Sequence, residues 1–431
     1  MKKPVAMLIL IVMASAMLFA NGKVEKAPLE ESKVLKIFVP QSPGVPQGME
    51  ALAKAYMEKN PDTQISVRSV PFGKYKEQLT VMWSSDEVDD IIMSAVTDAP
   101  TNAYFGSLLP LDDILDVSQQ GLFVPSVIET ATYEGHLYAY PFRESCSAMY
   151  YNKEYFALAG IEPATLENPW TWSQWKENIL AVRDAVEKKN GQRLWGLTFL
   201  SNPGAGDFWI TPIIRSNGVK GSNTYKAISP DGMTLTGYAD TPEAMEAYAF
   251  YQDLYQKDNI CSLAEVPDAF ATGQSITMIS FLATASQLNS KFPDLSWGLM
   301  PLPYFKTPLT HTGGFAISVS AKTKVPNLAK DFVKFAGSEE GLVTYFKTSG
   351  VDLVSRIGFA EKHPELYAKE AQQFFLKNLE MYGEARPITP GYTLYNAIIG
   401  FDMFEDIVSG ADIEKTVKDK IKIFENQMKN L

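Results

Sequence analysis

Residues 133–172 read YEGHLYAYPFRESCSAMYYNKEYFALAGIEPATLENPWTW, and this stretch decides the fold of the chain. Its pattern predicts a strand, a turn and a second strand ending in Tyr-Asn-Lys-Glu, followed by a short helix and a loop. A strong helix start closes the loop, because Thr171 can serve as N-cap and Gln174 as its N3 partner in a capping box. Trp170 and Trp175 occupy the N′ and N4 positions of a hydrophobic staple. These positions explain the tryptophans without a ligand, so we interpret them as structural.

The chain before this stretch alternates short apolar strands with helical patterns. Such an order predicts a parallel sheet with helices on both faces. Ligands of these sheets bind outside the carboxyl ends of the strands. Ser42, Ser94 and Asp98 are therefore candidate ligand-binding residues, although loop capping and turn formation would equally explain them. The strands are expected at residues 34–39, 65–70 and 90–93, with helices over 49–57 and 75–83.

The remainder of the chain continues in the same α/β style and ends in helices. Ser338 can cap the second member of a helix pair over residues 327–348, and Pro242 suits the first position of another helix. An apolar stripe over 413–428 predicts a helix packed on a core. Further strands are expected at 194–200, 275–280, 295–302 and 313–320.

Length and charge limit the class of protein. A chain of 431 residues is too long for one ordinary core and suggests two or three domains. The net charge of -11, without a basic run, argues against a nucleic-acid partner, because phosphate binding needs clustered Lys and Arg.

The N-terminus carries an export pattern. Lys2 and Lys3 precede an apolar stretch over residues 4–20, and the chain then turns polar. We expect a cleavable signal peptide at 1–20 and a disordered leader at 21–32; the alternative is a retained membrane anchor, for which the apolar run is slightly short. No cysteine near the cleavage region could carry a lipid, so the mature protein is expected in the periplasm.

Motifs for catalysis, metals and cofactors are missing from the sequence. The three histidines are His136, His311 and His363, none of them paired at ligand spacing, and no phosphate loop or nucleophile elbow occurs. We therefore expect no catalytic residue, no metal and no cofactor. Cys146 and Cys261 could form a disulfide, but a buried free thiol is favoured for Cys146 in its apolar strand pattern.

The stretch at 133–172 resembles the domain-crossing segment of the extracellular solute-binding proteins that deliver sugars to ABC importers, a family that includes maltose-binding-like and glycerol-phosphate-binding-like members. In that family a Tyr-Pro strand leads through a hinge into a strand ending Tyr-Asn-Lys. Later segments resemble the family in order and spacing over most of the chain. They are the helix start at 240–248, Gly273 with Met278 and Ser280, residues 300–303, the pair Gly313 and Gly314, and 385–390 with Tyr392.

The resemblance implies an α/β, two-lobed periplasmic binding protein fold of the class II type, with discontinuous lobes joined by three crossovers. It implies that lobe one comprises 33–142 plus 308–353, and that lobe two comprises 143–307 plus 354–431. Hinges are then expected near 142–145, 303–308 and 351–355. Periplasmic binding proteins in general close around their ligands by hinge bending, so the expectation of closure comes from the family and not from these residues.

A sugar site needs flat aromatic rings for C–H faces and planar polar groups for hydroxyls. Phe208 and Trp209 precede a helix that is expected to begin near Thr211. The resemblance places stacking aromatics at this point, although both rings could equally fill a core. Arg143 and Glu144 lie on the first hinge, where a surface ion pair is the competing explanation. Family members more often carry a small or apolar residue at position 143. Gly313 and Gly314 are expected to allow a close backbone approach at the cleft rather than a tight turn in solvent. The candidate ligand-binding residues are Ser42, Ser94, Asp98, Arg143, Glu144, Asn202, Asp207, Phe208, Trp209, Ser280, Gly313, Gly314, Arg386 and Tyr392.

The function implied by the resemblance is capture of a sugar or related polyhydroxylated solute between two lobes. The expected partners are this carbohydrate-like ligand and the transmembrane permease subunits of an ABC importer, and the protein is expected to be a monomer. The alternative from another class is a secreted carbohydrate-active enzyme on a similar two-lobed scaffold. Mono- or oligosaccharide, polyol, glycosyl phosphate and sugar acid all remain open as ligands.

Overall fold

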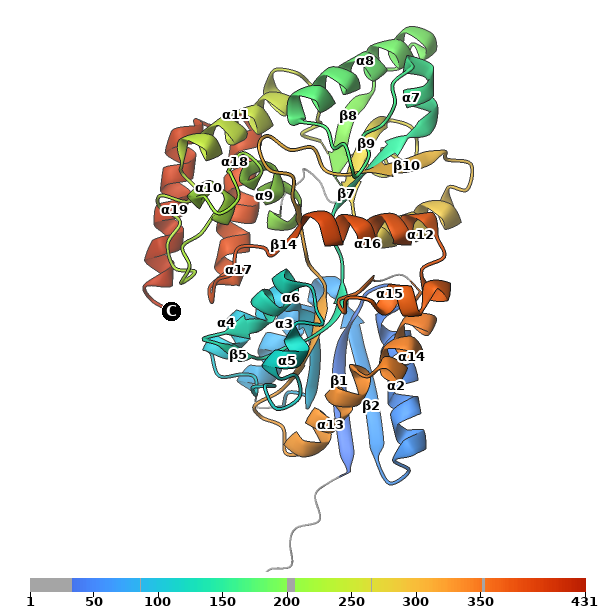
Figure 1. Ribbon diagram of the computed structural model, residues 1–431. Helices are drawn as coiled ribbons and strands as arrows, with labels where there is room; N and C mark the ends of the chain where they lie inside the picture. Colours follow the sequence, from blue (N-terminus) through green and yellow to red (C-terminus); the bar gives the residue numbers. More distant parts are fainter. Residues whose placement is uncertain (1–32, 86, 200–205, 265, 351–352) are drawn as a thin grey trace, which may run out of the picture. The chain divides into compact units, whose positions relative to one another are not determined.

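Two β-sheets with separate helical layers organise the chain (Figure 1). We call the elements around the six-stranded sheet lobe one and those around the four-stranded sheet lobe two. The predicted signal peptide and leader lie outside the described residues, and so does Asn202. The computed structural model describes residues 33–85, 87–199, 206–264, 266–350 and 353–431.

The sheet of lobe one has the strand order β13-β6-β12-β3-β1-β2. Strand β1 pairs in parallel with both β2 and β3, which confirms the predicted β-α-β-α-β unit. The whole sheet is mixed rather than parallel, because β12 returns from a distant part of the sequence and runs antiparallel to β3 and β6. The strands are β1 Val34–Gln41, β2 Gln64–Pro71, β3 Ile91–Ala95, β6 Tyr140–Glu144, β12 Phe315–Val319 and β13 Leu353–Val354.

Helices cover both faces of this sheet because successive side chains of a strand point to opposite sides. Ile37 and Val39 of β1 enter the core beneath α2, whereas Phe38 stacks on Tyr75 of α3. The short ribbon of β4 Thr132–Tyr133 and β5 His136–Leu137 also belongs to lobe one. Its helices are α2 Val45–Lys59, α3 Phe72–Ser84, η1 Val96–Asp98, α4 Ala99–Tyr104, α5 Val117–Gln120, α6 Pro125–Ala131, α13 Pro326–Ala336, α14 Glu339–Ser349, α15 Phe359–Lys362 and η2 Pro364–Leu366.

The sheet of lobe two has the order β10-β7-β9-β8, with β7 antiparallel to both of its neighbours. Helix α8 covers one face, and its predicted start is confirmed. The Gln174 N–H donates to Thr171 Oγ1 over 3.2 Å, and the Thr171 N–H donates to Gln174 Oε1 over 2.8 Å. Trp172 and Trp175 are fully buried. The strands are β7 Ala148–Asn152, β8 Trp195–Phe199, β9 Ser275–Ser280 and β10 Trp297–Met300.

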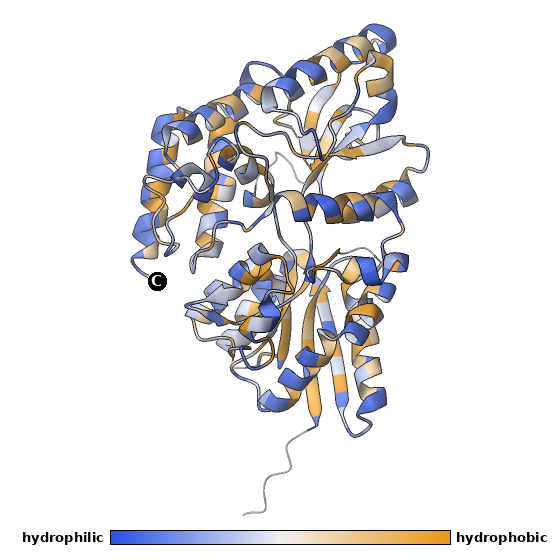
Figure 2. Cartoon of the chain, viewed as in Figure 1, coloured by the Kyte–Doolittle hydropathy of each residue, from blue (hydrophilic) through white to orange (hydrophobic). Residues whose placement is uncertain are grey.

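The remaining helices of lobe two are amphipathic, and Figure 2 shows hydrophilic and hydrophobic stretches alternating along α8 and α19. The stripe predicted over 413–428 is confirmed, since Val417, Ile421 and Phe424 of α19 are buried. No helix in the described part of the chain is both long and apolar enough to cross a membrane. The helices are α7 Lys153–Ala159, α8 Trp172–Asn190, α9 Asp207–Arg215, α10 Asn223–Lys226, α11 Pro242–Gln256, α12 Leu282–Lys291, α16 Glu370–Tyr382, α17 Tyr392–Tyr395, the π-helix η3 Asn396–Met403, α18 Phe404–Val408 and α19 Ile413–Met428.

The chain crosses between the sheets after β6, after β10 and after β13, so the fold is the two-lobed α/β periplasmic binding protein fold with three crossovers. The first two crossings run side by side, with an antiparallel bridge between Cys146 and Thr312. A parallel ribbon of β11 Thr310–His311 and β14 Gly383–Glu384 joins the second crossing to the chain after α16. One hydrophobic core continues through the first crossing.

The predicted lobe boundaries stay predictions. Val354, the first residue of the second half of predicted lobe two, pairs with Arg143 in the sheet of lobe one. The third predicted hinge includes residues 351 and 352, which lie outside the described ranges. Cys146 and Cys261 are both free and buried, so no disulfide joins them.

Replacing Thr171 with Ala should lower the free energy of unfolding by about 1 kcal/mol, because the substitution removes the side-chain acceptor of the capping box. Urea unfolding followed by far-UV circular dichroism measures this change. Thr348→Ala is the matched control, since Thr348 is exposed within α14 and its hydroxyl donates to the carbonyl of Thr344 in its own helix. Equal stability of the two variants would contradict the role of the cap.

Candidate functional site: an interlobe polar junction

Three of the predicted ligand-binding residues form one hydrogen-bonded group. The Tyr392 hydroxyl donates to Asp207 Oδ1 over 2.9 Å, and Arg386 Nη1 donates to the Tyr392 oxygen over 2.6 Å. The Arg386 guanidinium also lies 3.5 Å from Asp207 Oδ1. The side chains of Arg386 and Asp207 are only 10% and 2% exposed, so this ion pair is screened little by water.

The group contacts lobe one directly. Arg386 Nη2 donates to Thr97 Oγ1 over 3.2 Å. The ammonium of Lys76 lies 5.8 Å from the centre of the Tyr392 ring and forms a 2.8 Å ion pair with Asp98. We call the residues Asp207, Arg386 and Tyr392 of lobe two, with Thr97, Asp98 and Lys76 of lobe one, the polar junction.

Local backbone structure explains how Asp207 reaches the junction. Gly206 has φ 113°, a conformation that favours glycine, and its N–H donates to the carbonyl of Gly400 in η3. Asp207 then occupies the first turn of α9, where the partial positive charge of the helix start stabilises a carboxylate. A π-helix such as η3 is rare, and π-helical turns are frequently found at functional sites.

A buried histidine fixes the backbone on both sides of the junction. Arg215 Nη1 lies 2.8 Å from His311 Nε2 and donates to the carbonyl of Ala385 over 2.6 Å. Since a guanidinium can only donate, His311 accepts at Nε2 and donates from Nδ1 to the carbonyl of Asp207 over 3.1 Å. Burial, together with the positive charges of Arg215 and Arg386, holds the pKa of His311 well below its usual range, so the imidazole is neutral.

Phe208 and Trp209 lie in the first turn of α9, not before a helix that begins near Thr211 as the sequence suggested. The expectation was wrong because Gly206 starts the helix earlier and Pro212 is accommodated inside it. The Phe208 ring faces the junction, 5.4 Å from the guanidinium carbon of Arg386. Trp209 is 9% exposed and stacks on Phe281, with ring centres 6.0 Å apart. Their contact with a ligand stays a prediction.

Gly313 and Gly314 allow the close approach that the sequence predicted. A Cβ atom on Gly314 would lie 1.8 Å from the carbonyl oxygen of Arg143, and one on Gly313 would lie 2.9 Å from the Phe208 ring and 3.1 Å from Arg386. A side chain at position 314 would collide with the backbone, and one at position 313 would require Phe208 or Arg386 to shift. The two glycines therefore bring the second crossing against both the first hinge strand and the junction.

Arg143 and Glu144 are buried in β6 rather than paired at the surface. The Arg143 guanidinium lies over the Phe315 ring at 4.9 Å, and Glu144 Oε1 accepts the Ser145 N–H over 2.9 Å. Burial raises the pKa of the Glu144 carboxyl to about 7, and the backbone N–H groups of Ser145 and Gly313 with the nearby guanidinium groups offset this only in part.

Several buried polar atoms near the crossings have no hydrogen-bond partner among the described residues, and four of them belong to predicted ligand-binding residues or to the neighbouring Ser145. Glu144 Oε2 and Asp207 Oδ2 are acceptors, Arg386 Nε is a donor, and Ser145 Oγ can be either. A buried polar group without a partner costs free energy, so native proteins rarely retain one without a reason. A ligand with several hydroxyl groups could satisfy atoms of both kinds.

Three predicted residues lie apart from this group. Ser42 forms a backbone turn before α2, and its N–H donates to the carbonyl of Pro40. Ser94 is buried inside β3 opposite Ala316, and Ser280 Oγ lies 2.6 Å from Thr284 Oγ1 at the end of β9. Their contact with a ligand stays a prediction.

Sequence reasoning missed Thr97, Lys76 and His311. Thr97 directly precedes the candidate Asp98. The tendency of ligands to bind at the carboxyl ends of strands could therefore have identified Thr97 as well. No local pattern marks Lys76 or His311, because their partners Tyr392, Arg215 and Asp207 are remote in sequence.

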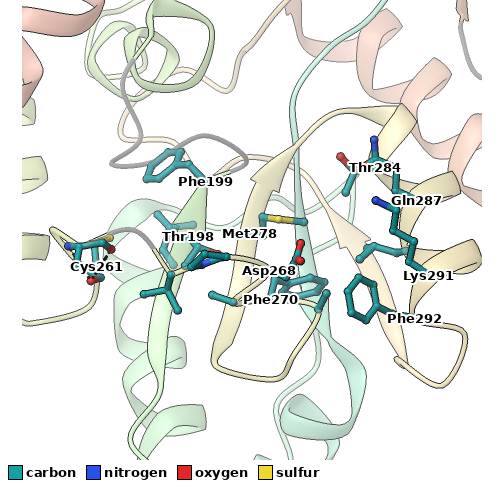
Figure 3. A pocket seen from close by; sticks show the side chains of 18 of the residues that line it. Thr198, Phe199, Cys261, Asp268, Phe270, Met278, Thr284, Gln287, Lys291 and Phe292 are labelled. Atoms are coloured by element: carbon teal, nitrogen blue, oxygen red, sulfur yellow. Dashed lines mark hydrogen bonds between the residues drawn. The ribbon is translucent and has the colours of Figure 1, made fainter. Parts of the chain in front are cut away.

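Two hollows of about 260 and 410 Å³ lie outside the junction. The smaller follows β8, β9 and α12, with Met278 near its centre and Gln287 and Lys291 along one side (Figure 3). Its charged groups Asp268 and Lys291 are exposed on the rim. Neither hollow is lined by the junction, whose buried and incompletely bonded polar groups are the stronger mark of a site.

The fold and the junction between its lobes define a class of protein, the two-lobed substrate-binding proteins. A solved ABC transporter solute-binding protein from Thermotoga lettingae, bound with α-D-tagatose, has a TM-score of 0.73 and 20% sequence identity, covering 92% of this chain and 100% of that one. The profile of the bacterial extracellular solute-binding protein family matches residues 40–342. The chain belongs to that family.

The curated relatives share about a quarter of the aligned residues with this chain. A binding protein of Brucella abortus is 24% identical over 276 residues, which are 63% of this chain and 63% of the relative. The chain therefore spans less than two thirds of that relative's length. The arabinooligosaccharide-binding protein of Bacillus subtilis is 23% identical over 370 residues, covering 82% of this chain and 80% of the relative.

The contribution of Glu144 to stability should fall as the pH rises from about 4.5 to about 7, because folded Glu144 holds its proton more tightly than the unfolded chain does. Glu144→Gln should flatten this part of the profile, since the amide does not titrate. Urea midpoints measured between pH 4 and 8 give the slope for each variant. Glu87→Gln, at an exposed position, is the control and should keep the slope of the parent protein.

Tyr392→Phe should lower the free energy of unfolding by about 1–3 kcal/mol, because it removes the hydroxyl that joins Asp207 to Arg386 inside the protein. Chemical denaturation measures the loss. Tyr104→Phe serves as the control, since Tyr104 is 40% exposed. An unchanged midpoint for Tyr392→Phe would mean that the hydroxyl does not hold the junction together.

Proposed function

We propose that this protein is an exported substrate-binding protein that captures a sugar or related polyhydroxylated solute between its lobes and delivers it to the permease of an ABC importer. The observation that carries the proposal is the set of buried polar atoms that lack a hydrogen-bond partner within the described residues, beside the aromatic rings of Phe208, Trp209 and Phe281. Sugars present hydroxyl groups at their edges and apolar C–H faces, and this combination of groups suits both.

The charges of the polar junction favour an uncharged solute. Arg386 is paired with Asp207 and Lys76 with Asp98, so the cations that reach the junction already have carboxylate partners. A phosphate or sugar acid would have to displace one of these carboxylates, whereas a hydroxyl can add to the remaining lone pairs and N–H groups.

The relatives support a carbohydrate ligand. The solved Thermotoga lettingae protein holds α-D-tagatose, and the Bacillus subtilis relative is an arabinooligosaccharide-binding protein. Both are binding proteins, which supports capture rather than catalysis for this chain. We therefore rank the secreted carbohydrate-active enzyme below the binding protein, and product formation separates the two.

Delivery requires that ligand binding change the relation of the lobes. A solute shifts an opening equilibrium only if it binds the closed state more tightly than the open one. The hydrogen bond from Arg386 to Thr97 already links the lobes, so a solute that bonds to Asp207 and Glu144 from the same space would add to that link. Hinge bending near 142–145 and 303–308 is part of the proposal.

Export and partners complete the proposal. The basic and apolar pattern of residues 1–20 supports a cleaved signal peptide, and the absence of a cysteine near its end supports a mature protein that is free in the periplasm. We further propose that the protein works as a monomer and docks on transmembrane permease subunits. Mass spectrometry of the exported protein would locate the cleavage site.

A thermal-shift and calorimetric screen of sugars, polyols, sugar phosphates and sugar acids tests the function. A stoichiometric shift with a neutral sugar and no product by chromatography is the expected result. Turnover of an oligosaccharide would favour the enzyme instead, and a response to phosphates alone would contradict the charge argument.

Trp209→Ala should weaken binding of the sugar found in that screen by at least tenfold, since it removes a ring beside the junction. It should also lower the free energy of unfolding by about 3 kcal/mol, because Trp209 belongs to the core of lobe two. Calorimetry well below the melting temperature separates the two effects. Trp297→Ala, at the start of β10 in lobe two and not part of the polar junction, is the matched control and should lose stability while keeping affinity.

A further inference from the structure

Phe72 has a large apolar side chain that lies outside the hydrophobic cores of the described residues. It is 59% exposed at the first position of α3, directly after β2 ends at Pro71. A singly exposed phenylalanine is common on protein surfaces and by itself needs no explanation. The position of Phe72 near Lys76 and Phe315 distinguishes it from an isolated surface phenylalanine.

The face of α3 that carries Phe72 is turned toward lobe two. Residues four apart on a helix lie on the same face, so Phe72 and Lys76 are neighbours there. Lys76 lies over the Tyr392 ring of lobe two and pairs with Asp98. Tyr75, three residues after Phe72, is buried against Phe38 of lobe one. Phe72 therefore stands at the lobe-one edge of the polar junction.

A second ring holds Phe72 in place. Its centre lies 6.2 Å from that of Phe315, with an angle of 85° between the planes, which is a favourable edge-to-face arrangement. Phe315 is fixed in turn by the Arg143 guanidinium, 4.9 Å above its ring, and it directly follows Gly313 and Gly314. This chain of contacts connects Phe72 to the first hinge strand.

We propose that Phe72 is the stacking platform of lobe one and selects solutes with a flat apolar C–H face. The inference rests on the proposed function and narrows it to sugars in the ring form. Phe208, Trp209 and Phe281 supply rings from lobe two, and Phe72 supplies one from the opposite side. A sugar ring can lie against such a surface, whereas an open-chain polyol has no rigid flat face to offer.

Exposure also suits this role in energetic terms. A platform that meets its ligand must be accessible before binding and must not depend on the ligand for its own position. The contact with Phe315 fixes the ring, so little side-chain freedom remains to be lost when a sugar binds. Since Phe72 is largely exposed, its removal should leave the fold intact, which makes the inference separable from stability.

The test is calorimetric titration of the whole exported chain with D-glucose, maltose, D-tagatose and sorbitol. Phe72→Ala should bind the sugar that the parent protein binds about tenfold more weakly, the size of one lost stacking contact. Phe72→Tyr should restore the affinity, and the melting temperature without sugar should be unchanged in both. Phe105→Ala is the matched control, since Phe105 is 57% exposed in lobe one and packs on Tyr104 instead.

The outcomes separate this inference from the proposed function. Sugar binding that is equal in Phe72→Ala and the parent protein overturns the platform while the proposed function stands. An equal loss in Phe105→Ala also overturns it, because the effect would then not belong to this position. A parent protein that prefers sorbitol contradicts the selection of rings. A parent protein that binds none of the screened solute classes overturns the proposed function and the platform together.

Discussion

The hydrogen bond between Arg215 and His311 is the interaction on which the site depends. Because the guanidinium must donate, it fixes one protonation pattern of the imidazole, and the other nitrogen then holds the backbone of Asp207. The same guanidinium holds the carbonyl of Ala385, next to Arg386. A single buried cation thus positions the two halves of the ion pair that faces lobe one.

Sequence patterns predicted those parts of the fold whose cause is local. The helix start at Thr171 follows from residues within four positions of it, and the β1 to β3 unit follows from alternating strand and helix periods. Gly313 and Gly314 were also correctly assigned to a close approach. The grouping of Asp207, Arg386 and Tyr392, nominated separately through the family resemblance, appeared only when the structure placed them in hydrogen-bonding distance.

The remainder could not be predicted because it depends on contacts between remote residues. Nothing near Lys76 in the sequence indicates that its ammonium lies over Tyr392, and His311 was set aside because it has no neighbour at the spacing of a metal site. The antiparallel entry of β12 into the first sheet has the same origin, since the chain builds most of lobe two before it returns. The predicted start of helix α9 was too late for a local reason. No pattern in the sequence indicated that Gly206 adopts a positive φ and that the helix begins at Asp207.

The core that continues through the first crossing has a consequence for how the protein comes apart. Phe142 of lobe one, Cys146 in the crossing and Tyr150 of lobe two belong to the same buried cluster. Such a cluster couples the lobes, so they form one cooperative unit rather than two domains that happen to be tethered. A chain divided at this point would expose apolar surface on both fragments, and neither lobe would be a sound starting point for a minimal sensor or a transplanted binding module.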